Sequence, residues 1–112
     1  MGTDLSDERL ENLTKVVGPT AQKNGVPLDI VNTSSTPLEY GYTYATCLVP
    51  VPALVSQAVD LLAEGGILNA FAGIPAGTFG DFDLQGIIER QIFMLGTSGS
   101  DVSDMRTVLR KI

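Results

Sequence analysis

The clearest hydrophobic pattern lies between residues 43 and 75, where two apolar runs flank an amphipathic segment. Residues 43–49 are apolar and β-branched, which is typical of a strand buried on both faces. The segment that follows has one apolar face at helical spacing, made by Val55, Ala58, Val59 and Leu62. Gly65 and Gly66 are expected to close this helix before a second strand at residues 67–72. Two buried strands joined by such a helix predict a parallel sheet.

The segment before this unit is predicted to contain one helix and one short strand. Asp4 or Ser6 can cap the helix, because both side chains accept hydrogen bonds from free backbone N–H groups. Its apolar face would comprise Leu10, Leu13, Val16 and Val17. Gly18 and Pro19 are expected to break or bend it. The apolar run at residues 28–32 predicts the strand.

The segment after the central unit predicts a polar loop at residues 76–83, a short helical or irregular piece at 84–91 and a strand at 92–95. Ser100 is expected to cap a last helix. The apolar positions of that helix are Val102, Met105, Leu109 and Ile112. This order of elements predicts an α/β fold, with a sheet of about four parallel strands and flanking helices.

Composition narrows the possible functions. Seven basic and thirteen acidic residues give a formal net charge of −6, which disfavours binding to nucleic acid or anionic lipid. No apolar run approaches the roughly 20 residues of a membrane span, and the amino-terminal segment is unlike a signal peptide. We therefore expect a cytoplasmic protein. With no histidine and a single cysteine, Cys47, the chain is expected to hold neither a structural zinc ion nor a Cys/His catalytic pair.

One long motif resembles a known family. The string VPVPALVSQAVDLLAEGGILNAFAGIP, followed by a polar loop, IFMLGTSGS and a helix, resembles the cofactor domain of the medium-chain dehydrogenases, the zinc-type alcohol and polyol dehydrogenases. The resemblance covers essentially the whole chain and implies a doubly wound, Rossmann-like parallel sheet. Full-length members transfer a hydride between a nicotinamide cofactor and an alcohol or polyol, with zinc polarising the oxygen.

The resemblance also implies which residues would contact a cofactor. Residues 1–4 would be the tail of the second strand, and Asp4 would match the acidic residue that holds the adenosine ribose, which favours NAD over NADP. Three strand ends would border the nicotinamide half of the cofactor. Their residues are Val49, Pro50 and Val51, then Ala72, Gly73 and Ile74, and finally Thr97, Ser98 and Gly99.

Two parts of such an enzyme have no counterpart in this sequence. The first strand with its G-x-G-x-x-G turn is absent, and so is the catalytic domain that supplies the zinc ligands. Residues 1–112 are therefore expected to form a single incomplete nucleotide-binding domain that is inactive alone, binds NAD weakly or not at all, and holds no zinc. The alternatives are a non-enzymatic α/β assembly module and one half of a split dehydrogenase that needs a missing-half polypeptide.

The doubly wound strand order has a physical consequence for a chain that lacks its first strands. The strand at residues 28–32 would lose its neighbour, and unpaired backbone in an apolar interior is costly. It is expected to pair with residues 43–49 or with strands from another chain. Sheet edges thus predict a homo-oligomer, and the strand at 43–49 is expected to have an abnormal neighbour.

Several residues have a structural reading beside a functional one. Asp4 is either a ribose ligand or a helix cap. Cys47 is expected to be an inert core thiol. Asp81 and Asp83 are a carboxylate pair of the kind that serves acid/base or cation chemistry, but we expect solvated loop charges. Residues 96–100 either bind an anion at a helix start or form a plain turn.

Three tyrosines alternate along the chain before and within the first central strand. They are Tyr40, Tyr42 and Tyr44. Alternate residues of a strand lie on the same face, and the surrounding chain is acidic. We therefore expect these rings to pack against one sheet face and not to stack on bases.

Overall fold

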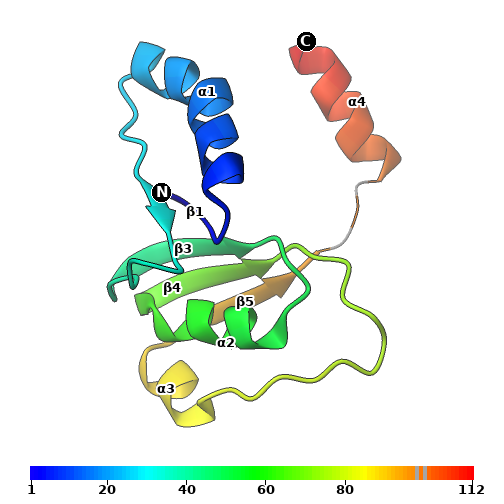
Figure 1. Cartoon of the computed structure of the whole chain (residues 1–112). Helices are drawn as coiled ribbons and strands as arrows, with labels where there is room; N and C mark the ends of the chain where they lie inside the picture. Colours follow the sequence, from blue (N-terminus) through cyan, green and yellow to red (C-terminus); the bar gives the residue numbers. More distant parts are fainter. Residues whose placement is uncertain (98, 100) are drawn as a thin grey trace. The chain divides into compact units, whose positions relative to one another are not determined.

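The computed structural model describes residues 1–97, 99 and 101–112, and internal contacts divide the chain into two units, residues 1–39 and 40–112 (Figure 1). The first unit contains β1 (Gly2–Asp4), α1 (Asp7–Lys23) and β2 (Ile30–Asn32). The second contains β3 (Tyr42–Cys47), α2 (Pro52–Asp60), β4 (Leu62–Ala70), α3 (Leu84–Glu89), β5 (Phe93–Gly96) and α4 (Val102–Lys111). The α/β class and the parallel pairing of all described strands are confirmed, but the strands form a two-stranded and a three-stranded sheet and not the one sheet of about four strands that was expected.

In the first unit, β1 and β2 form a two-stranded parallel sheet in which Gly2 is opposite Ile30 and Asp4 is opposite Asn32. The expectation that the strand at residues 28–32 lacks a neighbour was therefore wrong, as was its alternative pairing with residues 43–49. Three extended residues at the amino terminus are enough to supply the partner. The pairing continues at both ends, where Gly2 N donates to Asp29 O and Thr33 N donates to Asp4 O.

Helix α1 begins after Ser6, whose hydroxyl accepts a hydrogen bond from Arg9 N, so Ser6 and not Asp4 is the N-cap. The helix runs unbroken through Pro19. The Lys15 carbonyl that Pro19 leaves without its usual donor belongs to an exposed residue, where water can hydrate it. Of the four residues expected to form its apolar face, only Leu10 is buried.

The second unit has a three-stranded parallel sheet of order β3-β4-β5, with α2 packed on one face (Figure 1). Its buried hydrophobic residues are Cys47, Val55, Val59, Leu62 and Leu68. The predicted strand, helix, strand unit and the buried position of Cys47 are confirmed. Leu62 and Leu68 are completely buried, because β4 is the central strand and carries both of them towards the helix.

Gly65 and Gly66 do not close a helix, which corrects the sequence prediction. Helix α2 ends at Asp60, and both glycines lie inside β4. The register shifts between the pairs Tyr42–Leu62 and Tyr44–Ile67, where β4 has three more residues than β3. Gly65 has a φ of 70°, which a residue without a Cβ adopts readily. The two glycines therefore build an irregularity in the strand.

The same register shift separates the tyrosines. Tyr42 packs against the core, whereas Tyr44 is 55% exposed and Tyr40 lies outside the strand and is 62% exposed. The expectation that all three rings pack on one sheet face is wrong for Tyr40 and Tyr44. Strict alternation requires an uninterrupted ladder, and β4 interrupts it at its glycines.

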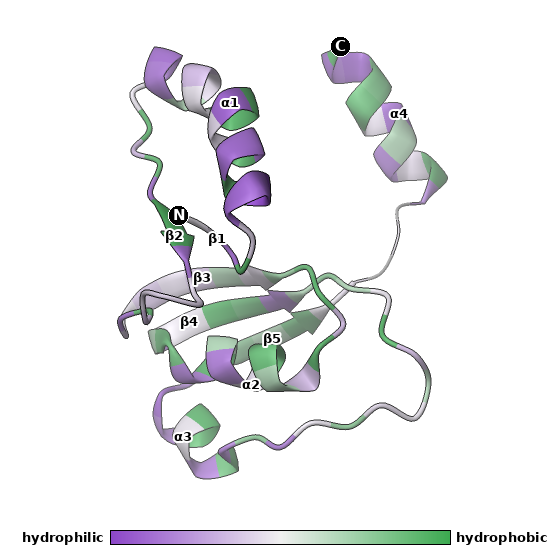
Figure 2. Ribbon diagram, in the orientation of Figure 1, coloured by the Kyte–Doolittle hydropathy of each residue, from purple (hydrophilic) through white to green (hydrophobic). Residues whose placement is uncertain are grey.

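The carboxyl-terminal elements largely follow the prediction. Asp83 caps α3 by accepting a hydrogen bond from Gly86 N, and Asp101 caps α4 in a reciprocal capping box with Asp104. Asp101 thus takes the role expected of Ser100, which lies outside the described residues. Figure 2 shows hydrophobic and hydrophilic residues alternating along α4. Within the described part of the chain, no helix has the length and apolar character of a membrane span.

The irregularity at Gly66 generates a testable prediction. A Cβ added there would lie 2.8 Å from Ala63 O and 2.9 Å from Leu62 Cβ, so Gly66→Ala should lower the free energy of unfolding by about 1–3 kcal/mol. Gly73→Ala is the matched control, because a Cβ at Gly73 meets no atom within 4 Å. Urea denaturation of both variants measures the difference, and equal stability would show that β4 tolerates a side chain at position 66.

Candidate functional site

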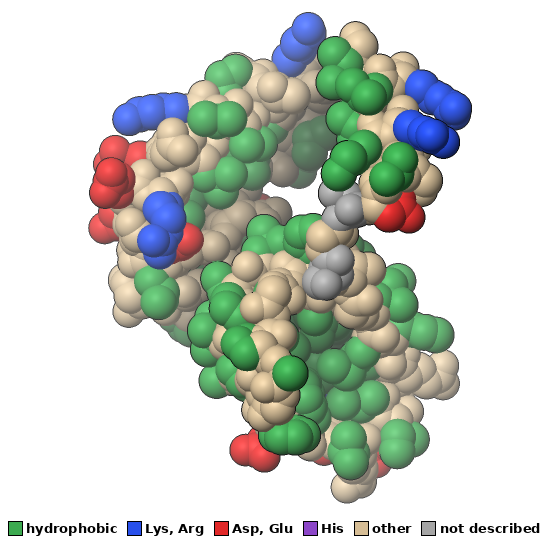
Figure 3. All heavy atoms as spheres, turned by 90° about the vertical axis from the view of Figure 1, so that its right-hand side faces the viewer, with side chains coloured by type: hydrophobic (Ala, Val, Ile, Leu, Met, Phe, Trp, Pro, Cys, Tyr) green, Lys and Arg blue, Asp and Glu red, His purple; other side chains and the backbone are tan. Residues whose placement is uncertain are grey.

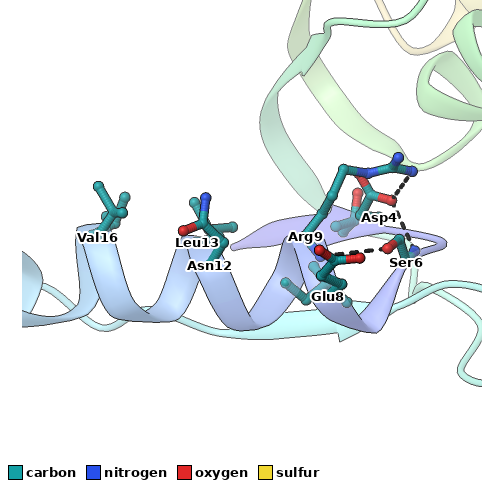
Figure 4. A pocket seen from close by; sticks show the side chains of 10 residues that line it. Asp4, Ser6, Glu8, Arg9, Asn12, Leu13 and Val16 are labelled. Atoms are coloured by element: carbon teal, nitrogen blue, oxygen red, sulfur yellow. Dashed lines mark hydrogen bonds and ion pairs between the residues drawn. The ribbon is translucent and has the colours of Figure 1, made fainter.

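Asp4 lies at the carboxyl end of β1, immediately before the turn into α1 (Figure 4). Ligands of open α/β sheets bind beyond the carboxyl ends of parallel strands. The side chain is 30% exposed and faces the start of the helix. Asp4, which the sequence resemblance implied as a ribose-binding carboxylate, thus lies at the carboxyl end of a parallel strand.

Arg9 is the main partner of the Asp4 carboxylate. Arg9 Nε donates to Asp4 Oδ2 at 2.9 Å, and Nη2 donates to Oδ1 at 2.6 Å, which is a bidentate ion pair. Ser6 N also donates to Oδ1 at 2.9 Å. These donors favour the charged form, so the Arg9 guanidinium and the Ser6 amide lower the pKa of Asp4 from 3.8 to about 2.

An open hollow of about 580 Å³ surrounds this ion pair on the surface of the first unit (Figure 4). Its lining combines polar groups from the start of α1 with apolar side chains from the next turns. The lining residues are Thr3, Asp4, Ser6, Glu8, Arg9, Leu10, Asn12, Leu13, Val16 and Val17. A carboxylate beside an apolar wall can accept hydrogen bonds from hydroxyl groups while a flat ring covers the wall.

The other predicted cofactor residues lie in the second unit, after β3, β4 and β5. The registers place Cys47, Ala70 and Gly96 side by side, so the three segments begin at the carboxyl-terminal end of the sheet. Phe71 N donates to Cys47 O at 2.9 Å and Thr97 N donates to Ala70 O at 3.2 Å, which ties them together. The structure therefore brings residues 49–51, 72–74 and Thr97 to the carboxyl-terminal end of the sheet.

These strand ends are apolar and largely exposed. Val49, Val51 and Ile74 are exposed to 43%, 44% and 39%, and a Cβ at Gly73 would meet open space. Pro50, Thr97 and Gly99 are also exposed, and Ala72 is half-buried. Ser98 lies outside the described residues. Figure 3 shows hydrophobic side chains gathered on the second unit, in the lower part of the view.

A row of hydrogen-bonded polar side chains lies near the carboxyl-terminal end of this sheet and was not anticipated from the sequence. Asn69 Nδ2 donates to the Tyr44 hydroxyl oxygen at 3.4 Å, and the Thr97 hydroxyl donates to Asn69 Oδ1 at 3.3 Å. Hydrogen bonds from Thr46 and Asn69 lower the pKa of Tyr44. The only sequence signal is an asparagine within an apolar strand, which by itself does not identify its partners.

The described residues contain no group of three or more metal-ligating side chains. The loop carboxylates Asp81 and Asp83 are exposed, as expected, and Asp83 serves as a helix cap. At the start of α4, Asp101 occupies the N-cap with its own carboxylate. An anion at the start of α4 would be repelled by that charge. Of residues 96–100, for which the sequence left anion binding and a plain turn open, Ser98 and Ser100 lie outside the described residues.

Comparison with known proteins supports the fold more than any activity. No protein-family model matches the chain. An uncharacterized protein, YggP, from Escherichia coli K12 is 31% identical over an alignment of 118 residues. The alignment covers 95% of this chain and 28% of the relative. The chain thus spans less than a third of the curated relative that it matches.

Three solved structures share the fold. Benzyl alcohol dehydrogenase from Acinetobacter calcoaceticus superposes with a TM-score of 0.70 at 21% identity, covering 96% of this chain and 30% of that enzyme. An alcohol dehydrogenase zinc-binding domain protein from Burkholderia ambifaria gives 0.69 at 18% identity, covering 85% and 25%. L-idonate 5-dehydrogenase from Escherichia coli gives 0.60 at 15% identity, covering 85% and 26%. The chain has a Rossmann-like fold that corresponds to a part of these dehydrogenases.

The Asp4–Arg9 pair predicts a measurable pKa change. Arg9→Gln should raise the pKa of Asp4 from about 2 towards 3.8, because the guanidinium is the largest cause of the lowering. Carboxyl NMR titration measures it, with Lys15→Gln as the control in the same helix. The pair stabilises the fold above the unfolded-state pKa, and this stabilisation is lost as pH falls through about 2. An unchanged pKa in Arg9→Gln would show that Arg9 does not hold the carboxylate.

Proposed function

We propose that the chain is a nucleotide-binding part of a zinc-type alcohol or polyol dehydrogenase, and that alone it binds NAD weakly and oxidises no alcohol. The observation that carries the proposal is the carboxylate of Asp4 at the carboxyl end of a parallel strand, beside the hollow at the start of α1. The dehydrogenase folds of the structural neighbours support it. A full-length relative would supply the zinc domain and the phosphate-binding turn.

In this proposal the adenosine ribose hydroxyls donate to the Asp4 carboxylate. Oδ2 accepts one hydrogen bond from Arg9 Nε and keeps a lone pair for a first hydroxyl. A second hydroxyl would replace or share a hydrogen bond that Arg9 makes, which is feasible because the Arg9 side chain is 69% exposed and can remain solvated after it moves. The carboxylate would repel the 2′-phosphate of NADP, so NAD is the favoured cofactor. Affinity stays low because the sequence has no G-x-G-x-x-G turn for the pyrophosphate.

The strand ends of the second unit would border the nicotinamide half of the cofactor. Val49, Val51 and Ile74 offer exposed apolar surface for a flat ring, and Gly73 leaves room for a close approach of the backbone. None of these residues supplies an acid, a base or a metal ligand. The proposal therefore assigns them to cofactor contact and assigns no chemical step to this chain.

A second candidate function is assembly without catalysis, and β5 favours it. All four residues of this edge strand are exposed, and Phe93, Met94 and Leu95 are apolar. An exposed apolar edge strand is a template for pairing with another strand. The partner would be a second copy or, for a split dehydrogenase, the polypeptide that carries the missing half.

Calorimetric titration with NAD separates the two candidates. The proposal predicts weak binding that Asp4→Ala weakens at least about tenfold, because a charge-assisted hydrogen bond is worth about 1.5–3 kcal/mol. Glu11→Ala is the matched control, since Glu11 is an exposed acid of α1 outside the hollow, 3.9 Å from Lys15.

Two outcomes contradict the first candidate. Absence of heat at millimolar NAD, together with a molar mass above that of one chain by light scattering, would favour assembly. Robust alcohol-dependent NADH production by the purified chain would overturn the statement that it lacks catalytic groups.

A further inference from the structure

Asn32 is the last residue of β2 and lies opposite Asp4 in the parallel pairing of β1 with β2. Its side-chain amide forms hydrogen bonds at both ends. The amide oxygen accepts hydrogen bonds from Ser34 N at 2.9 Å and from the Ser34 hydroxyl. The amide nitrogen donates to Asp7 Oδ1 at 2.6 Å and to Leu5 O at 3.4 Å. Asn32 therefore links the end of β2 to the segment that joins β1 to α1.

These partners fix the orientation of the Asn32 amide. Ser34 N can only donate, whereas the Leu5 carbonyl and the Asp7 carboxylate can only accept. The oxygen therefore faces Ser34, and the nitrogen faces residues 5 and 7. The oxygen closes a turn of the backbone after β2, a role that aspartate or serine also fulfils at such positions. The nitrogen adds nothing to that turn, so its contacts act on the segment between β1 and α1.

One peptide group connects these contacts to the Asp4 carboxylate. The bond between Leu5 and Ser6 joins the carbonyl that accepts from Asn32 to the N–H that donates to Asp4 Oδ1 at 2.9 Å. Because a peptide group is planar, holding its carbonyl also fixes the direction of its N–H. The bond to Asp7 is shorter and charge-assisted, so it anchors the far side of the same turn.

We propose that Asn32 is a positioning residue, which holds the turn of residues 5 and 6 so that the Asp4 carboxylate stays beside Arg9 at the hollow. Asn32 is not among the residues that line the hollow, so it acts through Asp4 and not on a ligand. Strand β1 has only three residues, and its pairing with β2 ends at Asp4. The side chain of Asn32 extends the attachment of the chain to β2 beyond that point.

Asn32→Ser tests this role without a change of charge. Serine can close the turn after β2, but its side chain is too short to reach Asp7. The pKa of Asp4 should rise from about 2 towards 3.8, because Arg9 and the Ser6 amide, which lower it, lose their alignment. Carboxyl NMR titration measures the change. Ser35→Ala is the control, since Ser35 Oγ donates to the backbone carbonyl of Asn32 at 3.3 Å. An unchanged pKa in Asn32→Ser would overturn the proposal.

Exchanging the two partners should restore the arrangement. The double variant Asp7→Asn with Asn32→Asp keeps the net charge and reverses the hydrogen bond, because the amide at position 7 then donates to the carboxylate at position 32. That carboxylate can still accept from Ser34 N. The pKa of Asp4 in the double variant should return close to about 2. A double variant in which this pKa is raised as far as in Asn32→Ser would overturn the proposal.

Hydrogen exchange separates positioning from general stabilisation. In Asn32→Ser the Ser6 amide should exchange at least about tenfold faster than in the wild type, whereas the Gly2 amide, which donates to Asp29 O, should keep its rate. Equal acceleration of both amides would show that Asn32 only stabilises the pairing of β1 with β2, which would overturn the proposal.

The effect of Asn32 on nucleotide affinity rests on the proposed function, whereas the pKa and the exchange rates do not. In calorimetric titration, Asn32→Ser should bind NAD at least about threefold more weakly than the wild type, because the carboxylate is no longer pre-oriented. Equal affinities would overturn the role of Asn32 in this site. A wild-type chain that binds no NAD would contradict the proposed function, and the pKa and exchange measurements would still decide whether Asn32 positions Asp4.

Discussion

The parallel pairing of β4 with both of its neighbours is the constraint on which the second unit depends. It places β3, β4 and β5 in one sheet and carries Leu62 and Leu68 to the side where α2 covers them. Arg90 reinforces the arrangement, because its Nη1 donates to the carbonyls of Val59 and Leu62, where the helix passes into the strand. Burial of the central strand therefore holds this unit together.

The same geometry decides where ligands can bind. In a parallel sheet the carboxyl ends of all strands lie at the same end of the sheet, so segments distant in sequence become neighbours there. In the second unit this end gathers the apolar ends of three strands, and in the first unit the end of β1 presents Asp4. Each unit thus offers contact surface, but the described residues offer no metal-ligand group. Contact surface at the carboxyl ends of parallel strands is what the proposed role as a cofactor-binding part requires.

The sequence predicted an element correctly where its hydrophobic pattern extended over several residues. It failed where a short motif fits two different local structures. Val55 and Val59 identified α2 correctly, because a buried face of two turns leaves a clear pattern. Gly65 and Gly66 were misread, since a double glycine fits a helix end and a strand irregularity equally well. β1 was too short for any pattern, and only its resemblance to a known strand pointed to it.

The candidate site was predictable in part for the same reason. Asp4 was found through the family resemblance, but its ion pair with Arg9 depends on how the chain turns between β1 and α1. Ser6 was one of two possible caps, and the structure selected it once Asp4 was engaged by Arg9. The row formed by Tyr44, Asn69 and Thr97 depends on strand register, which the irregularity in β4 shifts.

Chemical-shift mapping of the isotope-labelled chain during an NAD titration tests the central claim most directly. The account predicts that the largest changes fall on the backbone amides of Asp4 and Ser6 and on the Nε of Arg9, with smaller changes at Val49, Val51 and Gly73. Changes confined to other residues, or no changes at millimolar NAD, would contradict the claim that this chain carries part of a nucleotide site.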